Sequence, residues 1–129
     1  MTRREARECV MQMLYSLSFH EAEQADTILE EQTEDIKGKV LTFIQNTYKG
    51  IIENMSQIDE IISQNLKQWD ISRIAKIDHM ILRLAIYEIK WEEDVPDKVA
   101  VNEAVEIAKI YGTDKSPKFI HGVLGQVVQ

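Results

Sequence analysis

The sequence lacks the features of secreted and membrane-spanning proteins. Among 129 residues there is one cysteine, Cys9, so no disulfide can form within the chain and a reducing cytoplasm is the expected compartment. Proline and glycine are scarce, with two and five copies, and no repeat or low-complexity tract is present. No apolar run approaches 18 residues, and the N-terminus mixes polar with apolar residues, so neither a membrane span nor a secretory signal is predicted.

Lysine and arginine are missing from one stretch, residues 21–35. This stretch carries seven acidic residues, which by themselves equal the net charge of −7, because the other fifteen acids match the fifteen Lys and Arg. Nucleic-acid binding responds to charge within a Debye length of about 8–10 Å. The acidic total therefore does not exclude a nucleic-acid partner for the rest of the chain.

The residues that are abundant predict one helical domain over residues 1–129. Apolar residues make up 44% of the chain, enough for a core at this length. From Ala6 to Leu17 they recur at the spacing of one helix face, and Thr2 precedes that helix as a candidate N-cap. No segment shows sustained period-two alternation. We therefore predict an all-α, compact bundle of about seven helices.

Further apolar stripes and breaks give the expected helix positions. These are a short helix around Ile28, one from Ile36 towards Gly50, one from Ile51 to Leu66 that ends before Trp69, one from Ile74 to Tyr87 capped by Asp70 or Ser72, one from Val101 to Gly112, and a last one. Pro96 breaks the pattern before the sixth helix. Ser116 as N-cap, with Pro117 at the first helical position, is expected to begin the last helix.

The sequence offers little for catalysis or metal binding. Its histidines, His20, His79 and His121, are far apart, and one cysteine cannot build a zinc site. No phosphate-binding or dinucleotide-binding glycine motif is complete. Cys9 lies on the apolar stripe, where we expect a core role and not a nucleophile. We therefore predict a protein without catalytic residues, metal or cofactor.

Two basic stretches are the remaining candidates for binding. The first is Arg3, Arg4 and Arg7, placed where the helix macrodipole disfavours cations. The second surrounds the start of the last helix, with Lys115 and Lys118. Arginine forks and a helix N-terminus both bind phosphate, and an exposed aromatic beside them would stack on a base. Each stretch is also compatible with an ordinary solvated face, and the neighbouring aromatic, Phe119, is also compatible with core packing.

Four segments together resemble the NusB family of bacterial transcription antitermination factors. They are "RREARECVMQMLY", "IDHMILRLAIYEI", "DVPDKVAVNEAVEIAKIYG" and "KSPKFIHGVLG". The resemblance implies an all-helical fold of two small helical subdomains and a non-enzymatic role. Family members bind the boxA element of single-stranded nascent RNA together with a small-subunit ribosomal protein that acts as NusE. The pair helps RNA polymerase read through terminators, notably in rRNA operons.

The resemblance also assigns roles to residues of this chain. The implied RNA contacts are Arg3, Arg4, Arg7, Lys115, Lys118 and Phe119, and the implied protein-partner face is Tyr15 and Asp78, with Arg83 a weaker choice. Each partner-face residue has a structural alternative, because Tyr15 is also placed to pack, Asp78 to cap or pair, and Arg83 to stabilise the bundle. Lys115 stands where the family often has an acid, and His121 where it commonly has Asn.

Three hypotheses follow, and the first, the RNA-binding factor, makes a quantitative prediction. The alternative to the RNA-binding factor is a purely protein-binding helical adaptor or homodimer, and monomer versus homodimer stays open. A third is the N-terminal domain of an rRNA cytosine methyltransferase, which the chain's end at Gln129 disfavours. About five cations on single-stranded RNA predict a slope of log K against log salt near −3.5, from about −0.7 per contact.

Overall fold

The described residues, 1–68 and 70–129 of a computed structural model, form seven α-helices and two 3-10 turns. The helices are α1 (Arg3–Leu17), α2 (Ala25–Gln32), α3 (Gly38–Glu53), α4 (Met55–Gln64), α5 (Lys76–Trp91), α6 (Asp97–Tyr111) and α7 (Ser116–Val127). The 3-10 turns are η1 (Ala22–Gln24) and η2 (Ile71–Arg73). No strand occurs in these residues, so the predicted all-α class is confirmed. None of these helices is long and apolar enough to cross a membrane.

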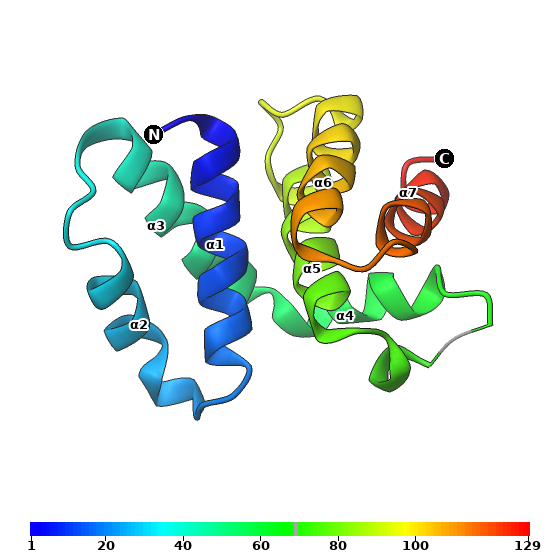
Figure 1. The fold of residues 1–129 in the computed structure, drawn as a ribbon, viewed down its shortest axis with the longest axis horizontal. Helices are drawn as coiled ribbons and strands as arrows, with labels where there is room; N and C mark the ends of the chain where they lie inside the picture. Colours follow the sequence, from blue (N-terminus) through cyan, green and yellow to red (C-terminus); the bar gives the residue numbers. More distant parts are fainter. Residues whose placement is uncertain (69) are drawn as a thin grey trace.

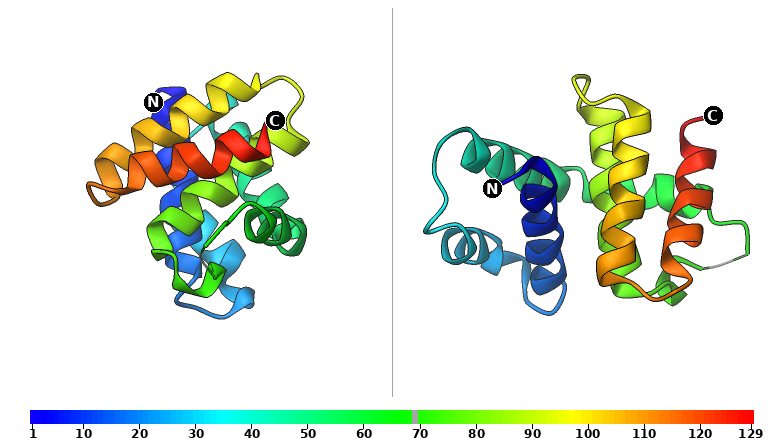
Figure 2. Two further views of the ribbon diagram at one scale, coloured as in Figure 1. Left: turned by 90° about the vertical axis from the view of Figure 1, so that its right-hand side faces the viewer. Right: turned by 45° about the horizontal axis from the view of Figure 1, so that its top comes forward.

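The helices form two groups that meet along α5, in agreement with the expected pair of subdomains. In the first group α1 packs on α2 and α3, and in the second α5 packs on α4, α6 and α7 (Figure 1). Both α1 and α3 also contact α5, which joins the groups. Figure 2 shows α6 and α7 running side by side over α5. The loop between α6 and α7 is therefore held on a rigid helical base.

One hydrophobic core runs through both groups. Its largest fully buried side chains come from α1, α3, α4 and α5, and include Met11, Leu14, Ile44, Tyr48, Ile58 and Leu82. Each buried Leu or Ile contributes about 1.5–3 kcal/mol through the hydrophobic effect. Packing of these apolar stripes, more than intrinsic propensity, is what holds helices of this length.

The predicted N-cap of α1 is confirmed. The Thr2 hydroxyl oxygen accepts a hydrogen bond from the Glu5 backbone N–H at 3.0 Å, and a Glu5 carboxylate oxygen accepts one from the Thr2 backbone N–H at 2.7 Å. This reciprocal capping box satisfies two donors at the helix start. Hydrogen bonding of the Glu5 carboxylate to Thr2, first to its backbone N–H and then to its side chain, lowers the pKa of the Glu5 carboxyl. The basic turn of α1 thus begins at a fixed residue.

The boundary between α3 and α4 differs from the expected one. Gly50 lies inside α3, which ends at Glu53 with Asn54 as its C-cap, and Asn54 Nδ2 donates to the Gly50 carbonyl oxygen at 2.8 Å. Glycine is needed at position 50 for close packing, since a Cβ there would collide with the Tyr87 ring. Ile51 therefore belongs to α3, and Leu66 follows the end of α4. Trp69 lies outside the described residues.

The start of α5 is also later than expected. Asp70 does cap a helix, but it is the 3-10 turn Ile71–Arg73, where its carboxylate accepts from the Ser72 N–H at 3.0 Å. Ile74 is extended and α5 begins at Lys76. At Pro96 the predicted break is confirmed, because α6 begins at the next residue.

Candidate functional site

The three arginines at the start of α1 lie in different environments. Arg3 and Arg4 are exposed, whereas Arg7 is 5% exposed and lies in the contact between α1 and α5. The helical spacing places Arg3 and Arg7 on one face. Along that face the side chain of Arg3 is exposed and that of Arg7, one helical turn later, is buried. The three arginines therefore do not form one solvent-exposed patch.

Arg7 forms a buried ion pair with Glu88 of α5. Its Nε donates to Oε1 at 2.8 Å and its Nη2 to Oε2 at 3.0 Å, so the pair is bidentate. Glu88 is likewise buried, and a second carboxylate, Glu103 of α6, lies 3.6 Å from Arg7 Nη1. A guanidinium engaged in this way is not available to a phosphate on the surface. The structure therefore favours an internal role for Arg7 over the expected RNA contact.

Arg3 and Arg4 are exposed but are held by neighbours. Arg4 pairs with Glu103 at 2.8 Å, and the hydrogen bond to that carboxylate raises the pKa of Arg4. Arg3 lies with its guanidinium carbon 4.1 Å from the centre of the Phe43 ring, a cation–π contact. Carboxylates thus match two of the three arginine charges. The positive field at this end of α1 is smaller than the sequence suggests.

The loop from α6 to α7 is built around Ser116 and Gly112. The Ser116 hydroxyl is buried and its oxygen accepts from the Thr113 N–H at 2.9 Å, so Ser116 closes a turn and is the first residue of α7 instead of its N-cap. Gly112 ends α6 as expected, in an extended conformation. A Cβ there would collide with the Ser116 side chain. This compact turn leaves Lys115 and Lys118 exposed.

Phe119 lines a cavity of about 260 Å³ in front of this turn. Lys115 and Arg73 lie at the same cavity, and Phe119 is half-buried, with part of its ring available to solvent. Asp78 also lines it. The structure therefore brings two of the predicted RNA contacts, Lys115 and Phe119, to one hollow, which Arg73 also lines.

Two predicted partner-face residues, Tyr15 and Asp78, meet at a neighbouring hollow of about 220 Å³. Asp78 is 7% exposed, and its Oδ1 has no hydrogen-bond partner, the one such buried side-chain atom in the described residues. Burial raises the pKa of the Asp78 carboxyl, against an opposing effect of the Ser116 hydroxyl. An unpartnered buried carboxylate oxygen costs free energy unless a ligand donates to it. Because Asp78 lines both hollows, it lies between the two candidate surfaces.

Arg83 lies elsewhere, in an ion pair that stabilises the bundle. Its Nη2 and Nε donate to the two carboxylate oxygens of Asp59 at 2.7 and 2.9 Å, and His79 Nε2 lies 2.9 Å from Asp59 Oδ1. Burial alone would raise the pKa of Asp59, but the hydrogen bonds with His79 and Arg83 lower it to about 2. The structure therefore does not bring Arg83 to the hollow that Tyr15 and Asp78 share.

Several residues at these surfaces were not identified from the sequence. Glu88 and Glu103 are more than 80 residues from the arginines they pair with, so no local pattern indicates them. Phe19 is different: it is 60% exposed, its ring centre is 5.0 Å from that of Tyr15, and Lys76 lies over it. The four-residue spacing of Tyr15 and Phe19 is the signal that would have found it.

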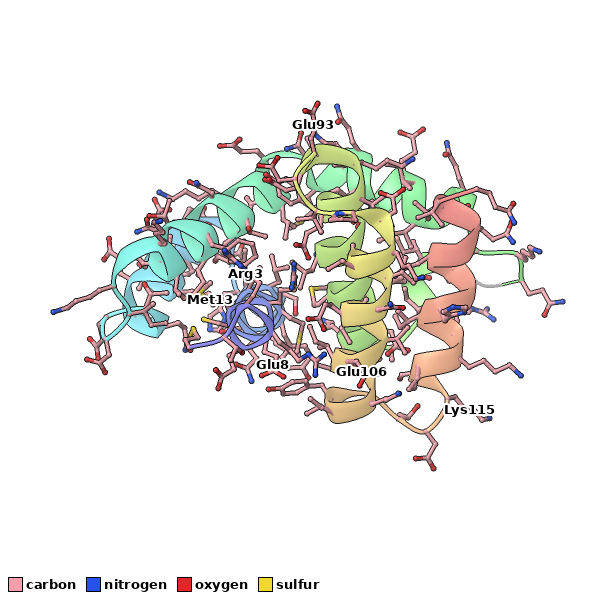
Figure 3. The ribbon with its side chains drawn as sticks, turned by 90° about the horizontal axis from the view of Figure 1, so that it is seen from above. Arg3, Glu8, Met13, Glu93, Glu106 and Lys115 are labelled. Atoms are coloured by element: carbon pink, nitrogen blue, oxygen red, sulfur yellow. The ribbon has the colours of Figure 1, made fainter. Side chains whose placement is uncertain are left out.

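The two groups of predicted RNA contacts are separated in space. Figure 3 shows Arg3 on the α3 side of α6 and Lys115 on the other side, beside the start of α7. An RNA strand that touches both groups must cross the molecule between them.

Within the described residues, no group of three or more His, Cys, Asp or Glu side chains is arranged to hold a metal ion.

Comparisons with known proteins give one consistent result. The model of the NusB family matches residues 4–129. Transcription antitermination protein NusB of Clostridium botulinum (strain Hall) is 39% identical over 143 residues, covering 99% of this chain and all of that protein. The structure of T. maritima NusB superposes with a TM-score of 0.92 at 39% identity, covering 98% of this chain and 90% of that one.

A more distant structure has the same fold. A chain from the crystal structure of antitermination factors NusB and NusE in complex with dsRNA superposes with a TM-score of 0.87 at 24% identity, covering 97% of this chain and 94% of that one. Fold and site together define a small all-helical protein of two packed helical groups, with exposed cations and an aromatic at the α6–α7 loop. The chain belongs to the NusB family.

Proposed function

We propose that this chain is a non-enzymatic transcription antitermination factor of the cytoplasm, acting as a single domain over residues 1–129. It binds boxA-type single-stranded RNA together with the ribosomal protein that acts as NusE. The pair joins an RNA polymerase antitermination complex, notably on rRNA operons. Family membership supports the general role, and the surfaces described above support the two binding partners.

The observation that carries the RNA proposal is the half-buried Phe119 ring and the exposed lysines that precede it in sequence. Lys115 and Lys118 are both exposed, and Lys115 lines the same cavity as the ring, together with Arg73. A base stacks on an aromatic face for about 1–3 kcal/mol, while neighbouring cations hold the backbone without reading sequence. Residues 115–119 supply both the aromatic ring and the neighbouring cations.

Arg3 and Arg4 supply a second set of phosphate contacts. Both are exposed, and their neighbours Phe43 and Glu103 hold them in place before RNA arrives, which lowers the entropy lost on binding. An incoming phosphate must compete with Glu103 for Arg4. Removal of Arg7 from the set leaves four cations, Lys115 and Lys118 included. We therefore lower the expected salt slope to about −2.8.

The hollow shared by Tyr15 and Asp78 is the proposed docking site for the ribosomal protein. It is lined by Tyr15 and by Asp78, whose buried Oδ1 has no hydrogen-bond partner, so a donor from a partner that reaches this oxygen would satisfy it. The fold is shared with a NusB chain crystallised with NusE and dsRNA, which supports an assembly of this kind.

A gel-shift experiment tests the proposal. A boxA-type RNA and an unrelated single strand are each titrated with the protein, with and without the ribosomal protein. We expect a preferential shift of the boxA-type RNA that the partner strengthens, and its loss in the Lys115→Glu/Lys118→Glu variant. Equal shifts of both RNAs under both conditions would remove the specific proposal. Retained partner binding without any RNA shift would favour the protein-binding adaptor.

A further inference from the structure

A groove of about 400 Å³ shares Phe119 as a lining residue with the cavity described above. One wall is the outer face of α7 and the other is the segment that follows α4. Its polar and small lining residues are Asn65, Lys67, Gln68, Lys118, Gly122 and Gln126. Phe119 lines both the groove and the cavity, so the two form adjoining parts of one surface.

The charge of the groove favours a polyanion. Its lining includes two lysines and, among the described residues, no acid, in a chain whose net charge is −7. Lys67 and Lys118 come from opposite walls and are both exposed. Cations on both walls of a groove are placed to follow a phosphate backbone that runs between them.

The uncharged side chains favour nucleotides over other polyanions. Asn65, Gln68 and Gln126 carry amides, which offer a donor and an acceptor each, as base edges require. The Asn65 amide is fixed, because its Nδ2 donates to the Ile61 carbonyl oxygen at 2.8 Å. The Phe119 ring, at the entrance from the cavity, provides the stacking surface that precedes them.

Gly122 keeps the groove open. A Cβ at this position has no heavy atom within 4 Å, so the space in front of it is empty and the residue is not needed for packing. Gly125, one turn further along α7, is equally unobstructed but does not line the groove. The two glycines are thus a matched pair of unobstructed helix positions, of which Gly122 lines the groove and Gly125 does not.

We propose that this groove is a second nucleotide subsite, in which single-stranded RNA continues past Phe119 with its backbone between Lys67 and Lys118 and its base edges on the three amides. The inference rests on the proposed RNA-binding function and extends it. Residues 65–68, which the predicted contacts do not include, then take part in binding.

The test compares Gly122→Leu with Gly125→Leu by fluorescence anisotropy on a labelled boxA-type RNA. Both variants are expected to fold, since Leu is the better helix former and a Cβ at either position has no heavy atom within 4 Å. Gly122→Leu fills the groove, and we expect its RNA affinity to fall by about tenfold, as for the loss of one base contact. Gly125→Leu is expected to keep the wild-type affinity.

A charge variant gives an independent readout. Lys67→Ala should make the salt slope shallower by about 0.7, whereas Lys39→Ala, at the start of α3 on the far side from α7, should leave it unchanged (Figure 1). Wild-type affinity in Gly122→Leu, or loss of the ribosomal partner alone, overturns the subsite and leaves the proposed function standing. Absence of RNA binding by the wild type overturns both.

Discussion

The buried ion pair between Arg7 and Glu88 predicts a non-additive loss of stability: each single substitution should cost much more than the double substitution. Arg7→Met leaves the Glu88 carboxylate buried without its bidentate partner, and Glu88→Leu leaves the guanidinium with Glu103 alone at 3.6 Å. Removing one member of such a pair costs about 3–5 kcal/mol. This is a large share of the roughly 5–15 kcal/mol by which a domain of this size is stable.

The double variant Arg7→Met/Glu88→Leu should behave differently. Both side chains are then apolar and of similar length, so no buried charge is left uncompensated. We expect its free energy of unfolding to lie within about 2 kcal/mol of the wild type, because replacement of a buried pair by apolar residues is often neutral or stabilising. The coupling energy of the double-mutant cycle should therefore exceed about 3 kcal/mol.

Urea unfolding followed by circular dichroism measures all four proteins, with Lys109→Ala as the control. Lys109 pairs with Glu106 at 2.7 Å on the surface, and its loss should cost less than about 1 kcal/mol. If a single variant does not fold, the double variant still reports on the pair. A cost below about 1 kcal/mol for both single variants would refute the buried, bidentate arrangement.

Two further predictions concern packing and pH. Gly50→Ala should lower the free energy of unfolding by about 1–3 kcal/mol because its Cβ collides with the Tyr87 ring, whereas Gly122→Ala should raise it by up to about 1 kcal/mol, both measured by urea unfolding. The Asp59 pKa of about 2 lies below its value in the unfolded chain, so the ionised carboxylate stabilises the folded protein. It adds about 2 kcal/mol to the free energy of unfolding above pH 4, and this contribution is lost as the pH falls towards 2. Asp59→Asn should remove that part of the acid dependence, and an unchanged acid profile would contradict the pairing.

Local patterns predicted the helices well, because their causes are local. The stripe from Ala6 to Leu17, the cap at Thr2 and the break at Pro96 depend on residues within a few positions. Gly50 shows where this fails: a glycine in a helical pattern was interpreted as an end, but its reason is the Tyr87 ring, 37 residues away in sequence.

The part of the candidate site that depends on residues close together in sequence could be predicted, and the part that depends on contacts between distant helices could not. Lys115 and Phe119 are brought to one hollow by a short turn whose residues are contiguous in sequence. The burial of Arg7 depends on Glu88 of another helix, and no spacing near Arg7 distinguishes it from Arg3. The groove beyond Phe119 joins α7 to the segment after α4, a pairing that only the tertiary structure creates.

The most direct test of the RNA-binding account is the salt dependence of affinity for a boxA-type RNA. Four cations, Arg3, Arg4, Lys115 and Lys118, predict a slope of log K against log salt near −2.8, and Lys67 of the proposed subsite would bring it to about −3.5. Arg3→Ala/Arg4→Ala should make the slope shallower by about 1.4, while Arg7→Met/Glu88→Leu should leave it unchanged. An affinity that does not vary with salt, or a slope that Arg3→Ala/Arg4→Ala leaves unchanged, would contradict the account.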